Sequence, residues 1–95
     1  MDKLSSEEVK QKLAGVDGWR IEGDSLKKDL KFAGFSEAME FMNKLAVEAE
    51  KMSHHPDWSN SYNKISISLT THSAGGITNN DFKLAQQADQ IARGI

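Results

Sequence analysis

Three segments of the chain repeat their apolar residues at the spacing of an α-helix. The first follows a capping box formed by Ser5 and Glu8. The second is predicted to begin with Ser36 as its cap, and the third follows a capping box formed by Thr78 and Asp81. The residues predicted to be buried are Val9, Leu13 and Val16 in the first segment, Ala38, Phe41, Met42, Leu45, Ala46 and Ala49 in the second, and Phe82, Ala85, Ala88, Ile91 and Ala92 in the third.

Between these segments, apolar and polar residues alternate as they do in half-buried β-strands. Residues 19–22 and 26–32 are predicted to form a β-hairpin around a turn at Gly23-Asp24, and residues 58–62 and 65–71 are predicted to form a second one. The order of elements is therefore α-β-β-α-β-β-α. It predicts an α+β fold, a two-layer sandwich of a four-stranded antiparallel sheet with about three helices packed on one face.

The second predicted hairpin turns at Asn63-Lys64. This turn pairs Trp58 with Leu69 and, by extension along both strands, His55 with His72. Directly opposed residues have Cβ atoms about 4.5–5.5 Å apart, which is near enough to share one ligand. The side chain of His72 is expected on the face opposite to the core-facing residues of the last strand, Ile65, Ile67 and Leu69.

Composition and charge narrow the class of protein. The 95 residues are 38% hydrophobic and 27% charged, which fits one globular domain, residues 1–95. The 14 acidic and 12 basic residues give a net charge of −2, which argues against nucleic acid as a direct ligand. Cysteine is absent, so disulfides, thiolate metal sites and cysteine nucleophiles are excluded. The first residues do not resemble a signal peptide and no apolar run is long enough to span a membrane, so we expect an intracellular protein.

The candidate chemistry lies in three histidines, His54, His55 and His72. Imidazole provides both proton donors and proton acceptors near neutral pH, so a cluster would suit general acid–base catalysis. The alternatives are unrelated surface histidines or a zinc site. Three histidines can bind zinc, but two of them are not spaced to lie on one helix face, so a metal site is not favoured.

Three further residues have structural explanations as well as functional ones. Asp81 is the acidic residue of a capping box. Glu50 lies near the end of the second helix, where a carboxylate interacts unfavourably with the helix dipole. Trp58 belongs to the core-facing alternation of its strand, which favours packing, although a residue at the start of a strand can also contact a ligand.

Together these residues resemble the pterin-4a-carbinolamine dehydratase family. The family pattern is an acid, three residues, His-His-Pro, an aromatic residue, a further histidine and a distal aspartate. Here it is matched by Glu50-Lys51-Met52-Ser53-His54-His55-Pro56-Asp57-Trp58, then Tyr62-Asn63-Lys64, Thr71-His72 and Asp81. The likeness is strongest from about Ala46 to Ala85. One departure is Ser53, where some members of the family carry aspartate.

The resemblance implies dehydration of 4a-hydroxytetrahydropterin, the 4a-carbinolamine, to quinonoid dihydropterin. In that role the protein would recycle tetrahydrobiopterin for an aromatic amino-acid hydroxylase without a cofactor of its own. The family's catalytic residues correspond to His54, His55 and His72, and its supporting or substrate-binding positions to Glu50, Trp58 and Asp81. We expect His54 and His72 to form the acid–base pair, with His55 binding substrate or sharing the role of base.

The resemblance also implies a homodimer or homotetramer. Animal members double as dimerisation cofactors of a homeodomain transcription factor. The alternative function is therefore a non-catalytic pterin-binding protein, an oligomerisation partner or a transcriptional coactivator. A cytoplasmic location is expected, with a nuclear one in addition if the coactivator role exists.

Overall fold

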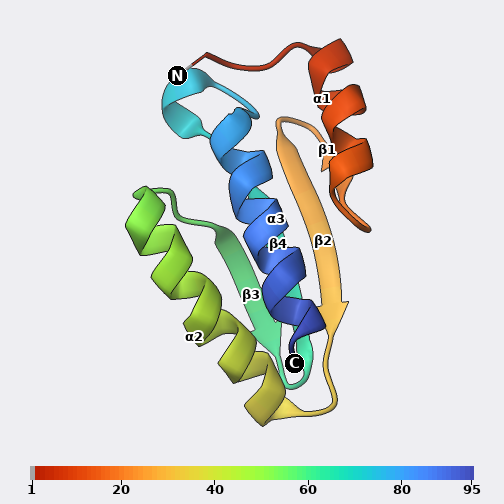
Figure 1. The fold of residues 1–95 in the computed structure, drawn as a ribbon, viewed down its shortest axis with the longest axis vertical. Helices are drawn as coiled ribbons and strands as arrows, with labels where there is room; N and C mark the ends of the chain where they lie inside the picture. Colours follow the sequence, from red (N-terminus) through yellow and green to blue (C-terminus); the bar gives the residue numbers. More distant parts are fainter. Residues whose placement is uncertain (1) are drawn as a thin grey trace.

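The computed structural model describes residues 2–95, and the predicted order of elements is confirmed (Figure 1). Two short 3₁₀ helices add to it, one directly after the first helix and one before the last. In chain order the elements are α1 (Ser6–Lys12), η1 (Leu13–Gly15), β1 (Arg20–Glu22), β2 (Ser25–Lys31), α2 (Phe35–Met52), β3 (Asp57–Ser61), β4 (Lys64–Leu69), η2 (His72–Ala74) and α3 (Asn79–Arg93).

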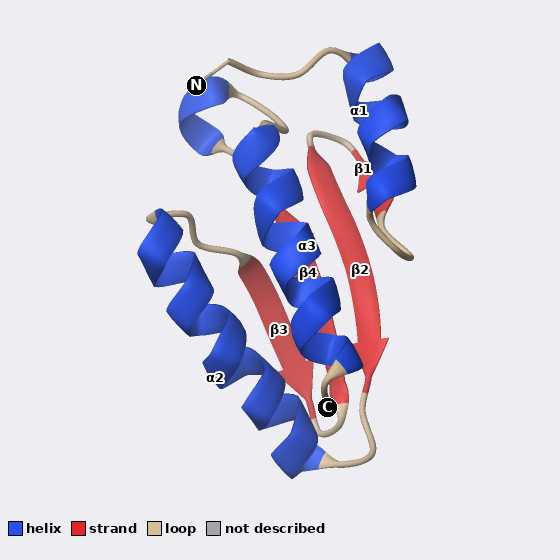
Figure 2. Ribbon diagram, viewed as in Figure 1, coloured by secondary structure: helices blue, strands red, loops and turns tan. Residues whose placement is uncertain are grey.

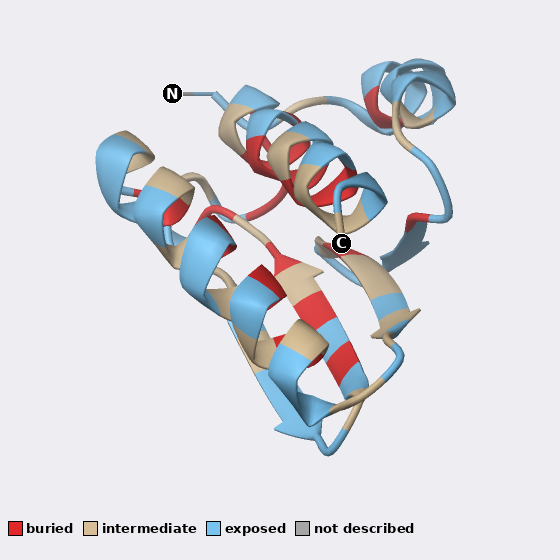
Figure 3. Cartoon of the chain, turned by 60° about the horizontal axis from the view of Figure 1, so that its bottom comes forward, coloured by how far each residue is buried: buried red, intermediate tan, exposed pale blue. Residues whose placement is uncertain are grey.

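The four strands form one antiparallel sheet in the order β1-β2-β4-β3, and the helices lie on one face of it (Figure 2). The predicted α+β sandwich is therefore confirmed. The core lies between the two layers, as the buried positions of the helices and of β4 show in Figure 3. Its fully buried side chains include Phe41 and Leu45 of α2, Leu84 of α3, and Ile65, Ile67 and Leu69 of β4. None of the helices in residues 2–95 is both long and apolar enough to cross a membrane.

Both predicted capping boxes are present, at the starts of α1 and α3. The predicted cap of α2 is wrong. This helix begins at Phe35, and Ser36 lies inside its first turn. Gly34 is the N-cap, because its carbonyl oxygen accepts the first helical hydrogen bond, from the backbone N–H of Ala38 at 3.2 Å.

The turn between β3 and β4 comes one residue earlier than predicted. Ser61 pairs with Lys64, so the turn residues are Tyr62 and Asn63, and Tyr62 adopts a positive φ of 54°. Asn63 is held there by the end of β2: its side-chain amide donates to the carbonyl of Phe32 at 2.9 Å, and its own carbonyl accepts from the N–H of Phe32 at 2.8 Å. Contacts with a third strand therefore decide where the hairpin turns.

The earlier turn shifts the pairing of β3 with β4 by two residues. Trp58 lies opposite Ile67 rather than Leu69. A shift of two preserves which side chains face the core, and so the predicted burial of β4 is confirmed. The predicted cross-strand pairing of His55 with His72 is wrong. β3 begins only at Asp57, directly after a proline that cannot donate to a ladder, and His72 already belongs to η2.

Candidate active site

His54 lies just beyond the end of α2 and turns back toward the core. Ser53 ends the helix in the left-handed conformation, with φ 51° and ψ 40°. The backbone N–H of His54 then donates to the carbonyl of Ala49 at 3.0 Å. The imidazole is buried, and its Nε2 lies 2.5 Å from Oδ1 of Asp81, a fully buried carboxylate in the first turn of α3.

Asp81 receives three hydrogen bonds, and these settle the tautomer of His54. Its Oδ2 accepts from the backbone N–H of Thr78 at 2.8 Å and from the hydroxyl of Thr71 at 2.9 Å. An ionised carboxylate can only accept hydrogen bonds, so Nε2 of His54 must be the donor to Oδ1. Nδ1 is therefore the ring nitrogen of His54 that remains for exchanging a proton with a ligand.

His55 points to a different carboxylate. Its Nε2 lies 2.5 Å from Oε1 of Glu50, in the last turns of α2. Both side chains are exposed, so this pair lies at the surface, whereas His54 is buried. The pairing explains the position of Glu50, because a carboxylate hydrogen-bonded to a ring nitrogen fixes the orientation of the imidazole.

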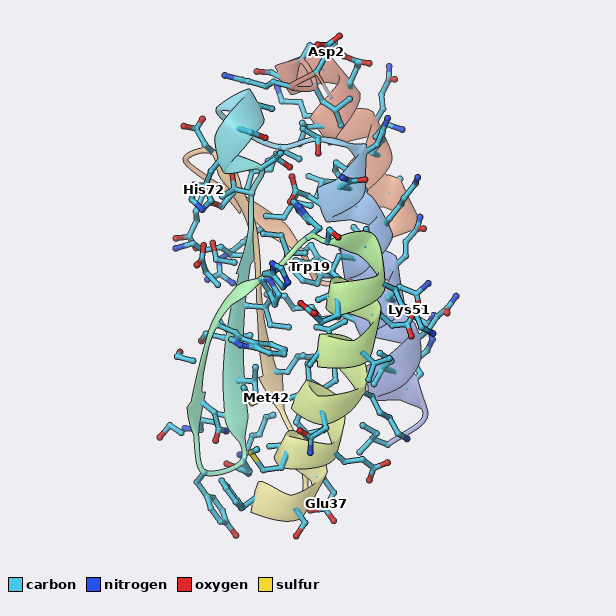
Figure 4. All side chains as sticks on the ribbon, turned by 90° about the vertical axis from the view of Figure 1, so that its left-hand side faces the viewer. Asp2, Trp19, Glu37, Met42, Lys51 and His72 are labelled. Atoms are coloured by element: carbon cyan, nitrogen blue, oxygen red, sulfur yellow. The ribbon has the colours of Figure 1, made fainter. Side chains whose placement is uncertain are left out.

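His72 begins η2 and is the most exposed of the three histidines. In the side view of Figure 4 its side chain lies on the strand side of the molecule, away from α2 and α3. Its Nε2 is 3.8 Å from Oδ2 of Asp57, the first residue of β3 and two residues beyond His55. Sequence analysis assigned no role to Asp57, although this residue directly follows the His-His-Pro run.

Trp58 packs against the core from the start of β3, as its alternation predicted. With Asp57 it also borders a groove of about 350 Å³, whose other lining residues are Arg20, Lys27, Asp29, Ser59, Ser66, Ile67 and Ser68. The hydrogen bond from the Ser66 hydroxyl, helped by the charge of Arg20, holds the pKa of the Asp29 carboxyl below its ordinary value. This groove is therefore polar and charged, with one aromatic wall.

The predicted site residues gather at one end of the sheet, where α2 ends, β3 begins, β4 ends and α3 begins (Figure 1). A bonded path runs from His54 through Asp81 to Thr71, which directly precedes His72. Sequence analysis quoted Thr71 beside His72 in the family pattern but did not count it among the site residues. In residues 2–95 no three His, Cys, Asp or Glu side chains are arranged to hold a metal ion.

Comparisons with known proteins match nearly the whole chain to one family. A family model described as pterin 4 alpha carbinolamine dehydratase matches residues 2–91. A Sinorhizobium fredii protein named a pterin-4-alpha-carbinolamine dehydratase is 44% identical over 98% of this chain and 90% of its own. A Prochlorococcus marinus protein of the same name is 53% identical over 77% of each chain.

Two solved structures resemble the fold. One is a Brucella melitensis protein described as a transcriptional coactivator/pterin dehydratase, with a TM-score of 0.93, 39% identity, and coverage of 96% of this chain and 99% of the other. The second is a pterin dehydratase-like protein described as a RuBisCO assembly factor in the alpha-carboxysome. It has a TM-score of 0.69 and 23% identity, covers 80% of this chain and 90% of its own, and supports the fold alone.

Proposed function

This chain belongs to the pterin-4-alpha-carbinolamine dehydratase family of lyases, and we propose that its histidines perform the dehydration by general acid and base catalysis. The observation that carries the proposal is the buried His54–Asp81 pair. It holds a proton on Nε2 and leaves Nδ1 for exchange with the substrate. We further propose that the product serves tetrahydrobiopterin recycling for an aromatic amino-acid hydroxylase.

The reaction needs one proton delivered and one removed. The 4a-hydroxyl group leaves as water once it has been protonated, since hydroxide is a poor leaving group. The neighbouring N–H gives up its proton, and its electron pair forms the new C=N bond of the quinonoid dihydropterin. The two transfers balance, so the net change is loss of one water molecule. Acid–base help of this kind is typically worth about 10²–10⁴-fold.

The three histidines divide these tasks according to their surroundings. His54 exchanges a proton through Nδ1, because its other nitrogen is occupied by Asp81. His72, exposed beside Asp57, handles the second proton. His55, oriented by Glu50, binds the pterin or shares the role of base.

A stopped-flow assay of carbinolamine dehydration with the purified protein tests this proposal. We expect His54→Ala and His72→Ala each to lower kcat by roughly 10²-fold or more with little change in KM, because interactions made mainly in the transition state affect kcat. The double variant should lose less than the product of the two single losses. Gln86→Ala, an exposed position on α3, is the matched control and should keep the wild-type rate. Near-wild-type rates in both histidine variants would refute the histidine mechanism.

One observation favours a second function. The Brucella melitensis structure is described as a transcriptional coactivator as well as a pterin dehydratase. A non-catalytic pterin-binding or oligomerisation role for this chain predicts pterin binding by calorimetry without turnover in the stopped-flow assay. Measurable turnover by the wild-type protein decides in favour of the enzyme.

A further inference from the structure

Thr71 is a buried polar residue at the point where β4 gives way to η2, directly before His72. Its hydroxyl oxygen lies 2.9 Å from Oδ2 of Asp81 and 2.7 Å from the hydroxyl oxygen of Thr78. We propose that Thr71 is a positioning residue of the dehydratase, coupling the buried His54–Asp81 pair to the turn that carries His72. The proposal rests on the histidine mechanism given above.

The chemistry of the three groups dictates the direction of the hydrogen bonds. Asp81 can only accept, so Thr71 uses its single hydroxyl proton to donate to Oδ2. The hydroxyl of Thr78 must then donate to Thr71, and its oxygen in turn accepts from the backbone N–H of Asn80 at 3.3 Å. The result is a one-way chain of donors that ends on the carboxylate holding His54.

The backbone of Thr71 holds the other half of the site. Its N–H donates to the carbonyl of Gly76 at 2.9 Å. Its carbonyl accepts from the N–H groups of Ala74 at 3.0 Å and Gly76 at 3.3 Å, which closes the turn containing His72. The side chain of Thr71 is therefore fixed to the His54 pair while its backbone fixes the His72 turn. Without the Thr71 hydroxyl, the His54–Asp81 pair would no longer be connected to the turn that carries His72.

A residue next door offers a matched control. The hydroxyl of Thr70 also makes one hydrogen bond, to the carbonyl of Asp24 at 2.7 Å, but this bond lies at the surface and leads to no histidine. Thr70→Val and Thr71→Val thus remove the same group from adjacent positions. Only the second removes a donor to the carboxylate that orients His54.

We expect Thr71→Val to lower kcat by roughly tenfold or more with a smaller change in KM, because a small misplacement of catalytic groups costs rate. Thr71→Ser should restore most of kcat, since it keeps the hydroxyl, and Thr70→Val should match the wild type. Wild-type kcat in Thr71→Val would overturn the proposal. So would a Thr71→Ser variant as slow as Thr71→Val, because the methyl group rather than the hydroxyl would then matter.

Proton NMR supplies a readout that does not depend on turnover. Exchange of the His54 Nε2 proton with solvent should be faster in Thr71→Val than in the wild type or Thr70→Val. If Thr71→Val does not fold, the same NMR measurement on the wild-type protein still tests the proposal. Its Thr71 hydroxyl proton, donated to the buried Asp81 carboxylate, should give a slowly exchanging resonance, and the absence of that resonance would overturn the proposal. Active His54→Ala and His72→Ala proteins would instead refute the histidine mechanism, so the two failures are distinguishable.

Discussion

Ser53 shows how a single backbone conformation directs the histidine pair. It ends α2 with a φ of 51°, in the left-handed region that non-glycine residues rarely adopt. Aspartate, which some family members carry at this position, is among the residues enriched in that region. Backbone geometry therefore accounts for both residues without a role for a carboxylate.

Replacing Ser53 tests this backbone role. Ser53→Val should lower the free energy of unfolding by about 1–2 kcal/mol, because a β-branched residue is strained in the left-handed region. Ser53→Gly should leave it unchanged or raise it. Urea denaturation followed by circular dichroism measures both. Ser59→Val, at an exposed extended position in β3, is the control and should cause no loss. Equal stability of Ser53→Val and the wild type would contradict the prediction.

At the scale of elements, α3 is attached to β2 by an ion pair that is largely buried. Lys28 lies on the core-facing side of β2, and its Nζ is 2.9 Å from Oδ1 of Asp89 on α3. The same carboxylate accepts from Nε1 of Trp19 at 2.9 Å and from the backbone N–H of Asp17 at 3.0 Å. Asp89 thus joins the last helix, the second strand and the loop before β1.

Removing the carboxylate should loosen all three elements at once. Asp89→Leu is expected to lower the free energy of unfolding by about 3 kcal/mol, because it leaves the Trp19 indole without its acceptor and Lys28 with only the backbone carbonyl of Asp17. Asp89→Asn keeps an oxygen acceptor for the indole and should cost less. Urea unfolding monitored by tryptophan fluorescence compares the two. A leucine variant as stable as the asparagine variant would show that these hydrogen bonds contribute little.

At the scale of the whole molecule, two sheet edges and two exposed apolar side chains are surfaces that a partner chain could cover. The sheet has two edges, β1 and β3, and edge strands present unpaired backbone groups. Two large apolar side chains on α2 are also half exposed, Phe35 at 50% and Val47 at 53%. Partners that cover such surfaces are most often further copies of the same chain, arranged with closed symmetry.

We therefore predict a homodimer or homotetramer in solution. Light scattering at micromolar concentration should give two or four times the chain mass of 10.5 kDa. Val47→Glu places a charge on the exposed face of α2 and should lower the mass if the helices meet. Ile21→Lys on β1 should lower it if that edge pairs. A monomer mass for the wild-type protein would contradict the prediction.

The sequence by itself determined the features that depend on neighbouring residues. The two capping boxes join residues three apart, and the burial of β4 follows from strict alternation, so both could be read from spacing alone. The fold class followed, because these local patterns also set the order of the elements. The three histidines stood out in the sequence as a cluster, and the family motif gave them and Asp81 their expected roles.

Only the tertiary structure decided what depends on residues far apart in the chain. The hairpin turned early because Asn63 is bonded to Phe32, which lies 31 positions before it. Asp81 looked fully explained by its capping box, and only packing brought it to His54, 27 positions away. Spacing rules describe the path of the chain within one element. The contacts that position a site form between elements, because a polar group buried by packing needs a hydrogen-bond partner and often has it on another element.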